Sequence, residues 1–445
     1  MDTPRIPPPS DEGELQILQE LELVQAQLQI RRADRANYVR SQDVMVLYDQ
    51  TIEQVRRLTE IRQGKKTQEN RVDRVVDSCF QLLSLFFMTI GRNSEAPAAY
   101  ALTSTIKRLL DHLTEADLFS EKDIASMGHT LERLTENMRK NPTDIYLETL
   151  LSKRIERCQE SLENLQKRLQ DYAEPILTTH EKLVSILRQM AAINTKSKFK
   201  PEDIHKMQKQ LKEIESKRVD EQFVDADGNV LAGSSQVSSL LERCQNYTEI
   251  VLERAGVFPE EWRPIYSKLV GIRNELDKVS LTQAWSLRET DLYDFQRQLD
   301  KIDESRVDGN WIDEKGQPAE LYVQRTLLYL IRRSYGYIYH LMISSEPVSE
   351  ALLPIYNQLQ TLKRCLIEVE ANGGVSSARE LFPYSMKLNS IDNLQKDGKF
   401  MVGGDIPEGQ GSVKELLDEC FERCYKLRVE AAAAEEVDTD NEVAA

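Results

Sequence analysis

An internal repeat constrains the fold of this chain more than any other feature of its sequence. Residues 210–228 align with residues 298–316 without a gap, and a shorter copy of the pattern returns at 388–400. The first two copies match Ile214, Arg218, Val219, Asp220, Phe223, Val224, Asp225 and Gly228 with Ile302, Arg306, Val307, Asp308, Trp311, Ile312, Asp313 and Gly316. Repeats of this length are typical of arrays in which each unit buries its apolar face against its neighbours.

Each repeat contains the pattern of three helices. The first helix opens near a proline, as at Pro175, Pro264 and Pro354, and continues with apolar residues three or four positions apart. Proline suits the first turn because its missing N–H has no helical partner there, and the apolar spacing gives one buried stripe. The second helix has acidic residues in its first turn, which favours the positive end of the helix dipole. The sequence therefore predicts an all-α fold of tandem three-helix repeats in an extended helical array, with short hairpin-like loops between the second and third helices.

These patterns give the expected domain boundaries. Helical repeats are predicted over residues 97–172, 175–257, 262–343 and 349–430, preceded by a helical segment over 12–92 that resembles a divergent repeat. Residues 1–11 are predicted to be a disordered N-terminus because they are rich in proline. Residues 431–445 are predicted to be a disordered acidic tail because they contain alanine and acid without an apolar period.

The loops after the second helices carry equivalent aspartates and aromatic residues. Their positions are Asp220, Asp308 and Asp397, followed by Phe223, Trp311 and Phe400. The short alternation around a turn predicts a small hairpin. Two interpretations follow: the aromatic is a structural plug over its own three-helix unit, or the loops form a row of partner contacts. The plug is the commoner use of a large aromatic at equivalent positions, and the sequence leaves both open.

Composition limits the class of protein. The formal charge is −16 with a pI near 5.1, which opposes general binding of nucleic acid or anionic lipid. The longest apolar stretch, residues 79–90, is shorter than the roughly 20 residues that a membrane span needs. The N-terminus lacks the basic and then apolar order of a secretory signal. We therefore expect a cytoplasmic protein that is also compatible with the nucleus.

No motif indicates an enzyme, a cofactor or a metal. The five histidines lack the spacing of a helical metal pair, and phosphate-binding glycine loops and nucleophile elbows are missing. Cys158, Cys244 and Cys420 occupy equivalent places in the repeats, which indicates packing between helices. The sequence therefore predicts a non-enzymatic protein without a cofactor.

Two basic clusters are candidates for anion contact. The segment from Arg31 to Arg74 is locally basic and reads as one helix that includes Arg31, Arg32 and Arg35. The second cluster is Arg332 and Arg333, beside three tyrosines. A solvated helix face is the ordinary explanation for such residues, and docking of a phosphate group, acidic peptide or lipid headgroup is the alternative.

The paired blocks at 218–228 and 306–316, together with the proline-led helix starts, resemble a fungal family of uncharacterised proteins that carry a duplicated domain of unknown function. The resemblance covers most of the chain and implies a fungal protein without an established activity. It brings no catalytic residues.

The sequence favours a non-enzymatic scaffold that binds protein partners through its helical-repeat surface. The alternative is a binding module for an anionic ligand, either a phosphopeptide or a phosphoinositide, that uses the basic segment 31–74 or Arg332 and Arg333. Partner identity and oligomeric state stay open.

Overall fold

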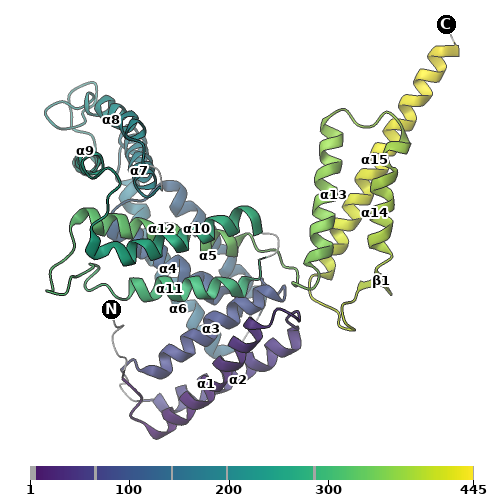
Figure 1. Cartoon of the computed structure of the whole chain (residues 1–445), viewed down its shortest axis with the longest axis horizontal. Coiled ribbons are helices and arrows are strands. Elements are labelled where there is room, and N and C mark those ends of the chain that lie inside the picture. Colours follow the sequence, from purple (N-terminus) through teal and green to yellow (C-terminus); the bar gives the residue numbers. More distant parts are fainter. Residues whose placement is uncertain (1–6, 65–67, 142–143, 197–198, 284–286, 444–445) are drawn as a thin grey trace. The chain divides into compact units, whose positions relative to one another are not determined.

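The computed structural model describes residues 7–64, 68–141, 144–196, 199–283 and 287–443. Its long helices in chain order are α1 (Glu12–Ala33), α2 (Ser41–Arg62), α3 (Arg71–Thr89), α4 (Ala99–Ala116), α5 (Glu121–Lys140), α6 (Ile145–Gln170), α7 (Glu174–Asn194), α8 (Pro201–Glu215), α9 (Ser234–Arg254), α10 (Arg263–Lys278), α11 (Leu292–Asp303), α12 (Leu321–Ile343), α13 (Leu353–Ala371), α14 (Phe382–Asp392) and α15 (Gln410–Val443) (Figure 1). Short 3₁₀ or π segments are η1 (Ala96–Ala98), η2 (Glu260–Trp262), η3 (Val279–Gln283), η4 (Glu289–Asp291) and η5 (Ala378–Leu381). The two strands are β1 (Gln395–Lys396) and β2 (Lys399–Phe400), which pair antiparallel. The all-α prediction is confirmed.

The chain divides into two compact units. Besides the extreme N-terminus, unit 1 comprises Ala99–Thr282 and Leu292–Ser344, and unit 2 comprises Pro8–Ala98, Gln283–Asp291 and Ser345–Ala445. Unit 1 therefore contains α4 to α12, and unit 2 contains α1 to α3 with α13 to α15. Since unit 2 combines both ends of the chain, the units do not follow the order of the sequence.

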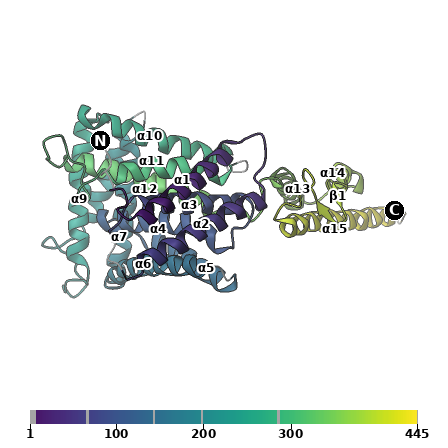
Figure 2. The same ribbon diagram turned by 90° about the horizontal axis from the view of Figure 1, so that it is seen from below.

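Consecutive helices pack in sets of three. The first helix of each set contacts the third, in the pairs α1 with α3, α4 with α6, α7 with α9, α10 with α12, and α13 with α15. Unit 1 adds a contact between α4 and α12, which belong to predicted repeats that are not adjacent in sequence (Figure 2). This contact departs from an array in which each repeat touches its sequence neighbours alone, and the extended array stays a prediction.

Buried cysteines occupy the same place in four of these sets. Their thiols lie against backbone carbonyls of the first helix: Cys79 against Leu21 at 3.7 Å, Cys158 against Thr103 at 3.8 Å, Cys244 against Leu183 at 3.8 Å and Cys420 against Leu359 at 3.6 Å. Burial raises the pKa of the Cys79 and Cys244 thiols to about 12. Such thiols are inert, and the geometry supports a packing role. In the α10–α12 set the corresponding residue is Ser334, which is fully buried.

The three aromatic loops also share one backbone geometry. The turn aspartates have left-handed φ angles, 48° at Asp220, 48° at Asp308 and 50° at Asp397. The following residue also has a positive φ, as expected for the tight turn of a two-residue hairpin. The aromatic side chains that follow are buried, with exposed fractions of 5% for Phe223, 1% for Trp311 and 2% for Phe400. Their burial favours the plug over display to a partner.

Two expectations from the sequence differ from the structure. Residues 431–443 were expected to be disordered, but α15 continues to Val443. Alanine is the strongest helix former, and a helix already packed through Leu427 needs no new nucleation. The basic segment 31–74 is also not one helix. It covers the end of α1, all of α2 and the start of α3, because Asn70 and Asp73 form a capping box that begins a new helix. Of the predicted disordered N-terminus, residues 1–6 lie outside the described residues.

Among the described residues, no helix is both long and apolar enough to cross a bilayer.

The plug interpretation predicts a large loss of stability on truncation of Phe400. Its ring lies in the buried core of the α13–α15 set. Phe400→Ala is expected to lower the free energy of unfolding by about 3–5 kcal/mol, because it leaves a cavity. Phe382→Ala serves as the control, since Phe382 is 64% exposed, and its effect should stay within about 0.5 kcal/mol. Urea denaturation followed by circular dichroism measures both, and equal effects would contradict the plug.

Candidate functional site

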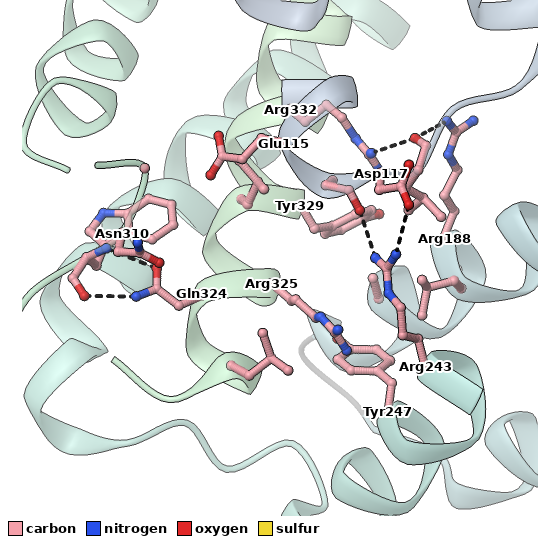
Figure 3. A pocket seen from close by; sticks show the side chains of 18 of the residues that line it. Glu115, Asp117, Arg188, Arg243, Tyr247, Asn310, Gln324, Arg325, Tyr329 and Arg332 are labelled. Atoms are coloured by element: carbon pink, nitrogen blue, oxygen red, sulfur yellow. Dashed lines mark hydrogen bonds and ion pairs between the residues drawn. The ribbon is translucent and has the colours of Figure 1, made fainter. Parts of the chain in front are cut away.

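A cavity of about 400 Å³ lies inside unit 1. Its walls come from the end of α4, from α7, α9 and α12, and from the hairpin turn that precedes Trp311 (Figure 3). Its volume is within the range of small-molecule pockets. The α4–α12 contact positions the cavity, because the end of α4 and the polar face of α12 form opposite parts of its lining.

Four arginines line this cavity. Arg188 projects from α7, Arg243 from α9, and Arg325 and Arg332 from α12. Arg325, Tyr329 and Arg332 are spaced by four and three residues, which places them on one face of α12. Figure 3 shows Arg325 directed toward Arg243 and Tyr247, with Arg332 and Arg188 at the other end. We call these four residues the arginine cluster.

The end of α4 supplies carbonyl oxygens to three members of the cluster. Asp117 has φ 50°, and Leu118 donates back to the Leu113 carbonyl, so the helix ends in a left-handed turn. Arg243 donates to the Ala116 carbonyl at 2.7 Å, and Arg188 and Arg332 both donate to the Leu118 carbonyl at 3.2 Å. The negative end of the α4 dipole thus faces the guanidinium groups.

Two of the three carboxylates that line the cavity, Glu115 and Asp117, have cationic partners, whereas Asp308 has no ion pair among the described residues. Arg188 binds Asp123 at 2.5 Å, and Asp123 also accepts from the backbone N–H of Ser120 at the start of α5. Glu115 pairs with Arg306 at 2.5 Å, and Asp117 pairs with Arg168 and, at 3.6 Å, with Arg243 of the cluster. Arg306 does not line the cavity, so Glu115 is neutralised from outside, whereas Asp117 is shared between Arg168 outside the cavity and Arg243 inside it.

Arg188 and Arg243 thus have carboxylate partners, whereas Arg325 and Arg332 have no ion pair among the described residues. Arg325 has no hydrogen bond or ion pair within the described residues. Burial, followed by the charge of Arg243, lowers the pKa of Arg325. Burial, followed by the charge of Arg188, lowers the pKa of Arg332 to about 10. Both shifts mean that burial and the neighbouring cations disfavour the charge of these side chains.

Three donors of lining residues are enclosed by the protein. The Nε atoms of Arg188 and Arg243 and the Nε1 atom of Trp311 are buried without a hydrogen-bond partner among the described residues. All three residues line the cavity. Because buried polar groups normally have partners, these three donors are an unfavourable feature of the packing around the cavity.

The Trp311 wall of the cavity is held by hydrogen bonds. The Trp311 backbone N–H donates to Gln324 Oε1 at 3.0 Å, and Gln324 Nε2 donates back to the Trp311 carbonyl at 2.9 Å. Arg306 lies over the Trp311 ring at 5.2 Å and donates to the Gly309 carbonyl at 2.9 Å. Gln410 holds Phe400 in the same way in unit 2, so this clasp belongs to the repeat.

A buried polar cluster supports Arg306 from behind. Asp303 accepts from Arg306 at 2.6 Å and lies 3.1 Å from the Nε2 atom of His112. Burial acts to raise the pKa of the Asp303 carboxyl, but the hydrogen bond with His112 and the charges of Arg306 and Arg108 hold it at about 2. Since that pKa is depressed, the stabilisation is present above the ordinary pKa of 3.8 and is lost as the pH falls through about 2.

The structure separates the residues predicted from sequence. Trp311, Asp308 and Arg332 line the cavity, and Arg333 lies at a neighbouring one. The equivalents of the Trp311 loop, Asp220 with Phe223 and Asp397 with Phe400, lie in other sets of helices.

The N-terminal basic residues do not converge on the cavity. They belong to unit 2, where Arg31 pairs with Asp43 at 3.0 Å and Arg35 pairs with Asp291. Arg32 lies near the end of α1. Such ion pairs are typical of a solvent-exposed helix surface.

Sequence reasoning missed Arg188, Arg243 and Arg325. A signal existed in the third helices, at the position two residues before the buried cysteine. That position is acidic in four sets, as Asp77, Glu156, Glu242 and Asp418, and becomes Arg332 in α12. The reversal of charge marks the α10–α12 set as different from the others.

The cavity lining contains hydrogen-bond donors but few of the side chains that commonly act as nucleophiles or general bases. Among the described lining residues there is no histidine, cysteine, serine or lysine. No group of three or more His, Cys, Asp or Glu side chains that could hold a metal ion occurs in the part of the chain that the structure describes. The arrangement is suited to holding an anion.

Comparison with known proteins gives the class of the chain. The model of a family described as a protein of unknown function (DUF2408) matches residues 169–289 and again 346–443. The two matches agree with the duplicated domain expected from the sequence. No solved structure gives a significant match.

Two yeast proteins are similar over nearly the whole chain. A CUB1 family protein of Schizosaccharomyces pombe is 36% identical, with 93% of this chain and 92% of the relative covered. The Cu(2+) suppressing and bleomycin sensitive protein 1 of Saccharomyces cerevisiae is 33% identical, with 96% of this chain and 91% of the relative covered. The chain therefore belongs to the fungal family of these two proteins, which the DUF2408 model describes as having unknown function.

The arginine cluster predicts opposite effects of two arginine substitutions. Arg325→Leu is expected to leave the free energy of unfolding unchanged or to raise it by about 1 kcal/mol, because it removes an uncompensated, partly buried charge. Arg306→Leu is the matched control. Its side chain is 9% exposed and holds Asp303 and Glu115, so its loss should lower the free energy by about 3–5 kcal/mol. Urea denaturation distinguishes the two, and a comparable loss for Arg325→Leu would mean that this charge is structurally required.

Proposed function

We propose that this protein is a helical binding module that takes a compact anionic ligand, with phosphate as its charged group, in the arginine cluster of unit 1. The observation that carries the proposal is Arg325, a partly buried guanidinium beside Arg243 without an ion pair among the described residues. An anion between Arg325 and Arg243 would supply the missing charge and would accept charge-assisted hydrogen bonds from their guanidinium groups.

A structural explanation accounts for part of the cluster. Three of its arginines donate to carbonyls at the end of α4, and cations commonly neutralise helix C-termini. That end carries only about half an elementary charge, however, so it balances one guanidinium at most. Arg325 makes no such bond, and the helix end does not explain it.

Arginine, rather than lysine, favours phosphate as the ligand group. The guanidinium fork donates two parallel hydrogen bonds that match the oxygens of a phosphate or carboxylate. Tyr329 adds a phenol group from α12, and burial raises its pKa, so it stays a neutral donor. A doubly charged phosphate would gain more from the crowded cations than a carboxylate.

The scaffold role predicted from the sequence stays a prediction, and it is compatible with this proposal because a helical scaffold can contain a ligand pocket. The name of the S. cerevisiae relative refers to copper suppression and bleomycin sensitivity. The proposal requires no metal.

The proposal predicts that pyrophosphate binds unit 1 through the arginine cluster. Isothermal titration of the full-length protein with pyrophosphate should show saturable binding that weakens as salt rises from low to physiological levels. Arg325→Leu and Arg243→Leu should each reduce the affinity at least about ten-fold, because each removes a charge-assisted hydrogen bond.

The control is Arg263→Leu. Arg263 is exposed on α10, away from the cavity, and its substitution should leave the affinity unchanged. Absence of binding, or equal losses in the control and in the two cluster variants, would refute the proposed function.

A further inference from the structure

A second cavity adjoins the arginine cluster in unit 1. Its volume is about 660 Å³, and it shares Arg188, Tyr329 and Arg332 with the first cavity. Its other walls come from α4, α5 and α7. We call the first the inner cavity and the second the outer cavity. The shared residues make their common boundary cationic.

The outer cavity has cations of its own. Lys122 on α5 and Arg333 on α12 line it. Lys122 is exposed and has no hydrogen bond or ion pair among the described residues. Arg333 lies over the Tyr337 ring at 4.4 Å and donates one hydrogen bond to its hydroxyl at 3.0 Å, which leaves other N–H groups of its guanidinium for a ligand.

The acids of the outer cavity do not oppose an anion strongly. Asp123 is held by Arg188 and by the N-terminus of α5. Glu181 accepts the backbone N–H of Glu121 at 2.8 Å. Both carboxylates therefore have partners, whereas Lys122 has none among the described residues. The Tyr339 hydroxyl bonds Thr130 at 2.8 Å and closes the far wall.

We propose that the inner and outer cavities form one composite site for a small molecule that carries several phosphate groups. This inference rests on the proposed function of the inner cavity. One phosphate lies between Arg325 and Arg243, another lies against Lys122 and Arg333, and Arg332 with Arg188 contacts the ligand between them.

The spacing along α12 defines the ligand class further. Arg325 and Arg332 are seven residues apart, which corresponds to roughly 10 Å along the helix. Arg332 marks the boundary between the cavities, so the outer phosphate lies beyond this distance, and pyrophosphate is too short to reach it from Arg325. A molecule with phosphates distributed around a ring, such as an inositol polyphosphate, reaches both ends of the site. The same chemistry occurs in the free compound and in the headgroup of a phosphoinositide lipid.

The test compares two probes on the full-length protein. Inositol hexakisphosphate should bind at least about ten-fold more tightly than pyrophosphate, because it gains the contacts of the outer cavity. The double variant Lys122→Gln, Arg333→Gln should remove this advantage and leave pyrophosphate binding within about two-fold. The matched control is Lys212→Gln, Arg263→Gln, which removes two exposed cations of unit 1 outside both cavities and should change neither affinity.

The outcomes separate the two proposals. Unchanged hexakisphosphate affinity in the double variant, with pyrophosphate still bound, would overturn the composite site and leave the inner site standing. Loss of both affinities in Arg325→Leu supports the inner site, and no binding of either probe by the wild-type protein would overturn both proposals. Equal losses in the control variant would show charge attraction without a site.

A vesicle experiment distinguishes the source of the ligand. Phosphatidylcholine vesicles with and without phosphatidylinositol bisphosphate are sedimented with the wild-type protein and the double variant. Specific co-sedimentation that the double variant loses would assign the site to the lipid headgroup. Binding of the soluble probe without co-sedimentation would assign it to the free compound. Both results support a polyphosphate site.

Discussion

The packing of α12 against α4 is the contact on which the organisation of unit 1 depends. It joins the first and third helical sets of the unit, which are separated in sequence by the whole of α7 to α9. The interface is aromatic and polar as well as aliphatic: the His112 ring lies 5.7 Å from that of Tyr335, whose hydroxyl donates to Asp300 at 2.6 Å. Without this contact, Arg332 would not meet the end of α4, and the inner cavity would have no wall.

The same contact buries charged side chains, which need partners of opposite charge. Behind the Trp311 hairpin, Asp303 is fully paired, because Arg306, Arg108 and His112 all bind its carboxylate. In the arginine cluster the pairing is incomplete, because Arg325 and Arg332 have no ion pair among the described residues. A protein normally avoids unpaired charge in a partly buried position, because desolvation is costly. This difference distinguishes the structural ion network around Asp303 from the cluster for which we propose an anionic ligand.

The sequence predicted local structure well where one residue type decides it. Pro175, Pro264 and Pro354 all lie in the first turn of a helix, and the paired residues at Asp308 and Asp397 form tight hairpin turns. The sequence did not predict correctly where helices end or continue when composition was the main guide. The alanine-rich end of α15 stays helical, and the basic segment is interrupted before α2 and again before α3. The candidate site was only partly visible because its arginines come from three helices spread over much of the chain. No local pattern links Arg188 to Arg243.

Comparison of equivalent positions across the sets separates what the scaffold requires from what it tolerates. At the position of Arg332 the other sets have acids, of which Glu156, Glu242 and Asp418 are exposed. In α12 this position meets the Leu118 carbonyl, which would repel a carboxylate and accepts from arginine. The helix contact alone thus accounts for that change of charge.

The position of Arg325 has no such structural cause. Nine residues before the buried cysteine or serine, the other sets have Asn70, Thr149, Ser235 and Gly411, so an uncharged residue satisfies the three-helix scaffold there. Arg325 nonetheless places a guanidinium beside Arg243, and burial, followed by the charge of Arg243, lowers the pKa of Arg325. A cation that the fold does not need, held where the fold makes it unfavourable, is the feature of this protein that binding of an anion explains and packing does not.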